Sequence, residues 1–248
     1  MILVLTYHII RAAGGLLTSD FYTISETQLE KQLAAVRRAG RTCLNPAALL
    51  DKGFSDRIFV LTFDDGTLDH FEVVAPVLEK ADCRAVFFVP TSKIDRKGYL
   101  THAQVRALSE QGHTIGVHSH DHRRLDQSTD SEIREQLKKS AGILQEITGR
   151  TTPFFAPPGG YINPRLHDVA VDLGFKVIRT MKWGYNKNLD LTALETIPIN
   201  GNMGEDKFDK ILQFREFGLM YAGKESLKAF LPMRTYELLR KLIFRIKS

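Results

Sequence analysis

The sequence contains little cysteine, and its spacing suits neither cross-linking nor metal binding. Only two cysteines, Cys43 and Cys83, occur in 248 residues, and they form no Cys-x-x-Cys pair. A disulfide framework in a small domain needs four or more cysteines, and a zinc finger needs closely spaced ligand pairs. We therefore interpret both thiols as free and buried, and we exclude a disulfide-rich or zinc-finger fold.

The sequence also lacks a low-complexity tract, an internal repeat and a linker rich in Pro, Gly or Ser. Its first eight residues have neither the basic start nor the small-residue cleavage site of a signal peptide, and their apolar run is too short. The composition argues against a disordered or membrane-spanning protein. For the chain as given we expect a cytoplasmic protein with one domain over residues 1–220.

Basic residues outnumber acidic ones, but their distribution gives little support to a nucleic-acid partner. The formal net charge is +5, and Lys and Arg are spread along the chain without a helix-turn-helix, RNP or finger motif. The tail differs, because residues 234–247 mix basic and apolar residues at helical spacing. We expect residues 221–248 to form a basic amphipathic helix packed on the main domain, with membrane-surface contact as the alternative.

Short β-rich runs alternate with helical patterns along the chain. The runs cover residues 2–9, 57–63, 83–89, 113–118, 153–156, 175–180 and 195–199. Such alternation predicts an α/β fold in which parallel strands are joined by crossover helices. The length suits one large domain, and an α/β barrel commonly needs about this many residues.

Start and stop signals place three helices between these strands. Ser25 and Thr101 each have a glutamine three residues on, which is the spacing of a capping box, and apolar residues follow at helical intervals. A longer helix starts near Asp130 and carries one apolar face. Gly149 closes it, because glycine readily adopts the left-handed conformation of a helix end. Such one-faced helices pack on a sheet.

The strongest local motif is a pair of carboxylates at the end of a predicted buried strand. Residues 60–66 read VLTFDDG, so Asp64 and Asp65 follow an apolar run. In parallel α/β folds, catalytic side chains gather at such carboxyl ends. Neighbouring residues there point in different directions, so one carboxylate can bind a metal while the other accepts a proton. The alternative is a turn that caps the following helix.

A second motif, GVHSHDH at residues 116–122, also follows a predicted strand. Three clustered imidazoles need partners for every ring nitrogen, and a metal ion supplies such partners. His118 and His122 converge on one ion if the segment turns after the strand, whereas an extended segment favours His118 with His120. A solvated histidine-rich loop is the alternative.

Two neutral imidazoles and one carboxylate leave coordination positions open, as catalytic metal sites do. No cysteine lies near these motifs. Nitrogen and oxygen ligands without thiolate favour Zn²⁺, and Co²⁺, Ni²⁺, Mn²⁺ or Fe²⁺ suit the same set. The two motifs therefore predict a catalytic site for a divalent metal.

These motifs resemble those of a known family. TFDDG at 62–66 and His-Ser-x-x-His at 118–122 are similar to the first two motifs of the polysaccharide deacetylases, carbohydrate esterase family 4. Similar segments at 6–8, 76–78, 85–89, 112–115, 147–149 and 155–160 extend the resemblance over about residues 2–220. It implies a distorted (β/α) barrel of about seven to eight parallel strands, and a metal-dependent hydrolase that removes N-acetyl groups from amino sugars of a polysaccharide or oligosaccharide.

The resemblance also implies roles for four side chains. Asp64 corresponds to the general base of the family, and Asp65, His118 and His122 correspond to its metal ligands. In the implied mechanism, the metal binds the acetyl carbonyl and a water, and Asp64 removes a proton from that water.

The third motif of the family, Arg-x-Pro-aromatic-Gly, is altered here. Residues 156–160 read APPGG, so both the arginine and the aromatic residue are missing. The N–H of Gly159 can still donate to an oxyanion, which a proline could not do, and Pro158 in the same segment is expected to contact substrate. Because the family arginine orients the base, another cation must lie beside Asp64 or Asp64 is less constrained. A turn without a chemical role is the alternative.

The late Leu-x-His motif of the family is absent, since residues 197–201 read IPING. A subset of similar deacetylases takes the histidine from the first strand, and Thr6-Tyr7-His8 resembles that variant. We expect His8 to be the general acid that protonates the leaving amine, and a core histidine bonded to a carbonyl is the alternative. Trp183 and Tyr185 are expected to stack on a sugar ring, with core packing as the alternative for Trp183.

Other functions fit the same residues. An O-acetyl ester, a formyl group on an amino sugar or an allantoin-like cyclic amide would suit the metal site. A relative that binds glycan without turnover would suit the missing arginine and histidine. We expect an N-acetylated glycan as the substrate, and acylated-glycan assays separate these alternatives.

Overall fold

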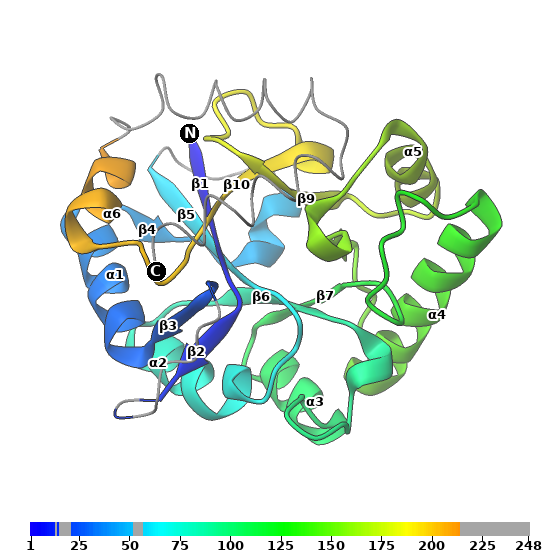
Figure 1. The fold of residues 1–248 in the computed structure, drawn as a ribbon, viewed down its shortest axis with the longest axis horizontal. Helices are drawn as coiled ribbons and strands as arrows, with labels where there is room; N and C mark the ends of the chain where they lie inside the picture. Colours follow the sequence, from blue (N-terminus) through cyan, green and yellow to red (C-terminus); the bar gives the residue numbers. More distant parts are fainter. Residues whose placement is uncertain (13, 15–20, 52–56, 214–248) are drawn as a thin grey trace. The chain divides into compact units, whose positions relative to one another are not determined.

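The computed structural model describes residues 1–12, 14, 21–51 and 57–213 (Figure 1). The chain divides into two compact units, Met1–Glu205 and a second unit that begins at Asp206. The predicted tail at 221–248, with its basic helix, lies outside the described residues, and the domain limit at residue 220 stays a prediction. No helix in the described ranges is long and apolar enough to cross a membrane.

Parallel strands close into a barrel, which confirms the predicted fold class (Figure 1). In ring order these are β1 (Ile2–Tyr7), β10 (Leu194–Pro198), β9 (Val177–Trp183), β8 (Phe154–Phe155), β7 (Thr114–Val117), β6 (Ala85–Val89) and β5 (Ile58–Phe63). β5 pairs with β1 and so closes the ring. An eighth strand, β4 (Thr42–Cys43), pairs with the start of β5, and β6 pairs with its later residues.

The predicted first strand, residues 2–9, is interrupted in the structure. β1 ends at Tyr7, and β2 (Ile9–Arg11) leaves the barrel to pair with β3 (Thr23–Ser25). His8 therefore stands between two strands, at the carboxyl end of β1. Tyr7 pairs with Phe63 of β5, so this end of β1 lies beside the start of the DDG motif.

Helices α1 to α5 lie around the ring of strands (Figure 1). The predicted starts are confirmed, since Ser25 accepts the N–H of Gln28 and Thr101 forms a complete capping box with Gln104. Gly149, with φ of 68°, ends the longest helix as predicted. The helices are α1 (Glu26–Arg38), α2 (Ala75–Lys80), α3 (His102–Glu110), α4 (Asp130–Thr148), α5 (Pro164–Asp172) and α6 (Glu205–Leu212).

Three buried threonines join neighbouring barrel strands near the end of the barrel that carries the DDG motif. The Thr6 hydroxyl bonds to those of Thr62, at 2.8 Å, and Thr196, at 2.6 Å. The hydroxyls of Thr62 and Thr196 also reach backbone carbonyls of β1. Each of these buried hydroxyls thus has a partner, which removes the cost of burying it. Because Thr62 lies two residues before Asp64, this network fixes where the DDG motif leaves the barrel.

His113 makes the stability of the barrel depend on pH. It is 4% exposed, and its Nδ1 accepts the N–H of Ala85 at 3.3 Å, which requires a neutral ring. Burial, with a smaller effect from the Arg84 charge, lowers the pKa of His113 to about 4. The unfolded chain, with a histidine pKa near 6.5, takes up the proton first as the pH falls. This residue therefore stabilises the fold above about pH 6.5, and up to about 3 kcal/mol is lost by about pH 4.

We expect a His113→Asn protein to lose less stability than the unaltered protein between about pH 6.5 and pH 4. Asn can still accept the N–H of Ala85 but has no proton to gain in this range. Urea unfolding across the range measures the difference. An equal fall in the two proteins would show that His113 does not cause the acid sensitivity.

Candidate active site and metal centre

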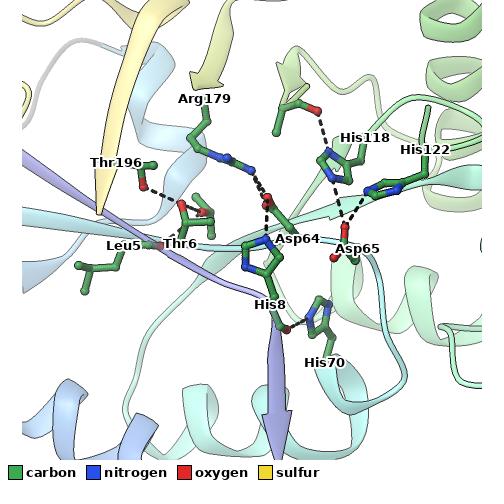
Figure 2. Close-up of polar contacts among 12 residues, drawn as sticks. Leu5, Thr6, His8, Asp64, Asp65, His70, His118, His122, Arg179 and Thr196 are labelled. Carbon is green, nitrogen blue, oxygen red and sulfur yellow. Dashed lines mark hydrogen bonds and ion pairs between the residues drawn. The ribbon is translucent and has the colours of Figure 1, made fainter. Parts of the chain in front are cut away.

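Asp64 lies at the carboxyl end of β5 and is almost completely buried. Its N–H donates to the carbonyl of Tyr7 at 3.0 Å, which continues the pairing of β5 with β1. Arg179 of β9 donates to both carboxylate oxygens from one guanidinium nitrogen, and it too is buried (Figure 2). The missing motif arginine left two alternatives, another cation beside Asp64 or a less constrained Asp64. Arg179 is that cation.

Asp65, His118 and His122 bring three candidate ligand atoms to within 4.8 Å of one another. Asp65 Oδ1 lies 2.9 Å from His122 Nε2 and 3.4 Å from His118 Nε2 (Figure 2). The His118 side chain is 2% exposed, whereas those of Asp65 and His122 are 32% and 36% exposed. The cluster is therefore anchored in the barrel on one side and reachable from solvent on the other.

Left-handed backbone at three non-glycine residues produces this convergence. The φ angles are 78° at Asp65, 60° at Ser119 and 64° at His122. Such a conformation costs roughly 1–2 kcal/mol per residue, so the surrounding structure must enforce it. Ser119 Oγ accepts the N–H of His122 at 3.0 Å, and the carbonyl of Ser119 accepts the hydroxyl of Ser140 in α4 at 3.0 Å. These bonds hold the tight turn that follows β7.

The turn selects between the two histidine pairs that the sequence left open. His118 and His122 face Asp65, whereas His120 bonds through Nδ1 to the hydroxyl of Thr91 at 2.8 Å. An extended segment would have placed His120 on the same side as His118. The geometry therefore favours His118 with His122.

Hydrogen bonding orients the His118 imidazole toward Asp65, and the His122 ring supplies a nitrogen without a hydrogen-bond partner among the described residues. His118 Nδ1 donates to the carbonyl of Ala156 at 2.7 Å, so its Nε2 carries the lone pair and faces Asp65. His122 Nε2 is buried and, within the described ranges, makes no hydrogen bond although Asp65 is near. A divalent cation among these three groups would satisfy that nitrogen, and their nitrogen and oxygen atoms are ligands that Zn²⁺ accepts. The residues thus fit the metal that the family resemblance implies.

The charges of the cluster are strongly coupled. Burial alone would raise the pKa of Asp65, but the adjacent imidazoles of His118 and His122 hold this pKa far below its usual range. Burial alone would lower the pKa of His118, but Asp65 and the charge of Asp64 raise it. The carboxylates thus favour positive charge at this position, which a proton or a metal cation can supply.

His8 faces Asp64 from the carboxyl end of β1 (Figure 2). Its Nε2 lies 3.9 Å from Asp64 Oδ2, and its ring stacks on Tyr22 with centroids 4.6 Å apart. Burial lowers the pKa of His8, and the charges of Asp64 and Asp65 offset only part of this effect. The imidazole is therefore neutral at neutral pH and has one nitrogen beside the buried carboxylate.

The turn after β8 carries Gly159, the predicted oxyanion donor. Gly159 and Gly160 both have positive φ, 65° and 73°, and a Cβ at Gly160 would lie 2.2 Å from a side chain of β9. Only glycine fits this turn without strain. Pro158 is buried in the same turn, and Ala156, the partner of His118, comes just before it. The chain therefore leads directly from the candidate metal site to the Gly159 turn.

The two predicted sugar-stacking rings are not both brought to this site. Trp183 ends β9 and pairs with β10. The chain then turns back, and Asn186 exchanges backbone hydrogen bonds with Ile2 at the start of β1. Ile2 lies six positions before His8, roughly 20 Å at about 3.3 Å per residue, so Tyr185 lies near the opposite end of β1. Its predicted contact with substrate is corrected by this placement, and that of Trp183 stays a prediction.

Three polar residues at the site were not identified from the sequence. Arg179 lies in the strand segment Val-Ile-Arg-Thr, where a charge inside an apolar run was the available signal. Asp69 and His70 follow the DDG motif, and they bond to backbone groups of Ile10 and His8. No sequence pattern marks those two contacts, because they join segments about sixty residues apart.

Comparison with known proteins finds similarity to one family. A sequence model of the polysaccharide deacetylase family matches residues 51–178. A peptidoglycan-N-acetylglucosamine deacetylase of Bacillus cereus is 28% identical over 142 residues, 54% of this chain and 50% of that protein. PgdA, the peptidoglycan-N-acetylglucosamine deacetylase of Listeria monocytogenes, is 30% identical over 139 residues, 54% of this chain and 28% of that protein.

The chain thus spans half or less of the length of these two relatives. A solved structure is similar over nearly its whole length. The Streptococcus pyogenes deacetylase PplD, determined in complex with acetate, has a TM-score of 0.75 and 25% sequence identity to this chain. The match covers 87% of this chain and 98% of that one.

Proposed function

This chain belongs to the polysaccharide deacetylase family, and on that premise we propose that it is a metal-dependent enzyme that removes N-acetyl groups from amino sugars of a glycan. The observation that carries the proposal is the convergence of Asp65, His118 and His122 next to the buried carboxylate of Asp64. The two relatives named for deacetylating N-acetylglucosamine in peptidoglycan support the choice of bond.

Asp65, His118 and His122 would hold the cation through one oxygen and two nitrogen atoms. Zn²⁺ suits this set best, and Co²⁺, Ni²⁺, Mn²⁺ or Fe²⁺ are alternatives. When bound, such a cation supplies a Lewis acid for the acetyl carbonyl and lowers the pKa of a water toward about 7. The other steps fall to the side chains and backbone around it.

Asp64 is the base in this proposal. Its carboxylate would accept a proton from the attacking water, and Arg179 holds both of its oxygens in place. The N–H of Gly159 would donate to the oxyanion that develops on the acetyl group, in the role that backbone donors have in other acyl-transfer sites. Pro158 would border the acetyl group as part of the same turn.

His8 would complete the path of the proton. Hydrolysis of the amide moves one proton from water to the departing nitrogen, and His8 Nε2 lies 3.9 Å from Asp64 Oδ2. Because burial lowers the pKa of His8, the resting imidazole carries no extra proton. We infer that the proton accepted by Asp64 passes through His8 to the amine, which leaves as a free amino sugar with acetate as the second product.

A His8→Ala protein should have a kcat for an N-acetylated sugar about 10²- to 10⁴-fold below that of the unaltered protein, since a proton donor is removed. Its metal content should be unchanged, because His8 is not among the three candidate ligands. Acetate release and bound metal are measured on the same preparations. His102→Ala is the matched control, because that imidazole is exposed and paired with Asp95 on the surface. Unaltered turnover in His8→Ala would end the acid role.

The substrate is tested by acetate release from the zinc-loaded protein. We expect release from N-acetylglucosamine oligomers and peptidoglycan to exceed release from O-acetylated xylan, with no turnover of a formyl amino sugar or allantoin. A preference for the ester, formyl or cyclic amide substrate would show that the enzyme acts on that group rather than on N-acetyl groups. Glycan binding without acetate release would identify a non-catalytic relative and contradict the proposal.

A further inference from the structure

Two side chains just after the DDG motif, Asp69 and His70, form hydrogen bonds to the backbone on both sides of Ile9. We call these two hydrogen bonds the clamp. Asp69 Oδ2 accepts the N–H of Ile10 at 2.7 Å. His70 Nε2 lies 2.8 Å from the carbonyl oxygen of His8 (Figure 2). A carbonyl oxygen can only accept, so the His70 proton is on Nε2 and the ring is the donor. The segment that carries the two catalytic carboxylates therefore also holds the segment that carries His8.

The clamp lies where the pairing of β1 with β5 ends. The last pair between β1 and β5 joins Tyr7 to Phe63, and from Ile9 onward the chain pairs instead with the three-residue strand β3. His8 belongs to neither strand. Its position relative to Asp64 thus depends on contacts other than the barrel ladder, and the bond from His70 is made to His8 itself.

His70 is fixed tightly enough to serve as an anchor. It is fully buried, and its ring centroid lies 5.6 Å from that of Phe63 and 5.5 Å from that of Phe87. Phe63 immediately precedes Asp64, so one packing cluster sets the position of both. His70 also begins a five-residue π-helix, His70–Val74, a widened turn that occurs frequently at functional sites. A buried imidazole is costly without a partner, and the carbonyl of His8 is that partner.

We propose that Asp69 and His70 are positioning residues that set the distance between His8 and Asp64. They act through the backbone on either side of Ile9 and are not among the three candidate metal ligands. The inference rests on the proposed function, in which His8 delivers a proton to the leaving amine. A displacement of about 1 Å in a reacting group can cost about 10²-fold in rate, so loss of the clamp should be visible in turnover.

The test compares two leaving groups. An amine must be protonated as it leaves, whereas the phenolate of 4-nitrophenyl acetate leaves without a proton and so does not need His8. His70→Leu should lower kcat on N-acetylglucosamine oligomers by about 10- to 100-fold, with little change for the ester and unchanged zinc content. His70→Gln, which keeps a side-chain N–H at a similar reach, should restore most of the amide activity.

Matched variants separate positioning from general damage. His113→Leu removes another buried imidazole that packs on Phe87 but bonds to Ala85, and it should leave the ratio of the two activities unchanged. If His70→Leu does not fold, Asp69→Ala at the half-buried Asp69 tests the same clamp and should also lower amide turnover selectively. Equal losses on both substrates, or full amide turnover in the variants, would overturn the positioning role. Absence of amide turnover in the unaltered protein would overturn the proposed function, and this inference with it.

Discussion

An Asp65→Asn protein should lose its metal and, with it, turnover. Asparagine keeps the shape of the side chain but removes the negative charge that lies 2.9 Å from His122 and 3.4 Å from His118. Changes to groups that merely support metal ligands cost about 10- to 100-fold in metal affinity, so loss of a ligand carboxylate should cost more than about 100-fold. Metal catalysis contributes several kcal/mol, so acetate release should fall by at least about 10³-fold.

Zinc titration and acetate release on the same preparations measure both effects. Asp95→Asn is the matched control, because Asp95 pairs with a single imidazole, His102, on the surface, where both side chains are more than half exposed. That variant should leave zinc affinity and turnover unchanged. Zinc affinity in Asp65→Asn equal to that of the unaltered protein would show that the three-residue site is not the metal centre.

Arg179→Met and Asp64→Asn should each destabilise the fold by about 3–5 kcal/mol, and the double variant should be more stable than either. Arg179 and Asp64 are 1% and 3% exposed, so removal of one leaves the other charged or polar group buried without its partner. Removal of both leaves no orphan charge, since Met and Asn are neutral. Urea unfolding of the metal-free proteins measures the four free energies of this cycle.

The same variants also test catalysis, and a further variant serves as a surface control for stability. The Asp64→Asn protein and the double variant both lack the proton acceptor, so turnover should be lower by about 10²- to 10⁴-fold with zinc still bound. Arg134→Met breaks an exposed ion pair with Asp172 and should change stability by less than about 1 kcal/mol. A double variant whose loss of stability equals the sum of the two single losses would show that the buried pair is not energetically coupled.

The candidate ligands and the base were predictable because each lies in a short motif at a strand end. Adjacency of Asp64 and Asp65 after an apolar strand indicates two carboxylates that point different ways, and the structure directs one to Arg179 and the other to His118 and His122. The choice of His122 over His120 was not predictable in this way. It depends on left-handed backbone at Ser119, which bonds to α4 enforce.

Arg179 and His70 illustrate what a one-dimensional pattern omits. Arg179 reaches Asp64 across 115 positions of sequence, and His70 reaches His8 across 62. The charge within an apolar strand was a usable signal for the contact of Arg179. The contact of His70 had no such signal, because it requires the end of β1 and the π-helix to lie side by side. The misplacement of Tyr185 has the same origin, because proximity to a strand end does not reveal that the chain turns back along β1.

The amino-acid sequence alone predicted the alternation of parallel strands and helices and the positions of the principal helices, and its motifs pointed to Asp65 and the 118–122 histidine cluster. Periodicity and capping are local, and so are the short motifs that carry the family resemblance, which implied the barrel. Only the tertiary structure decided which cation holds Asp64, which histidine pairs with His118 and what fixes His8. Those choices depend on closure of the barrel, because it brings the ends of β1, β5 and β7 together with Arg179 of β9 and so creates contacts between segments far apart in the chain.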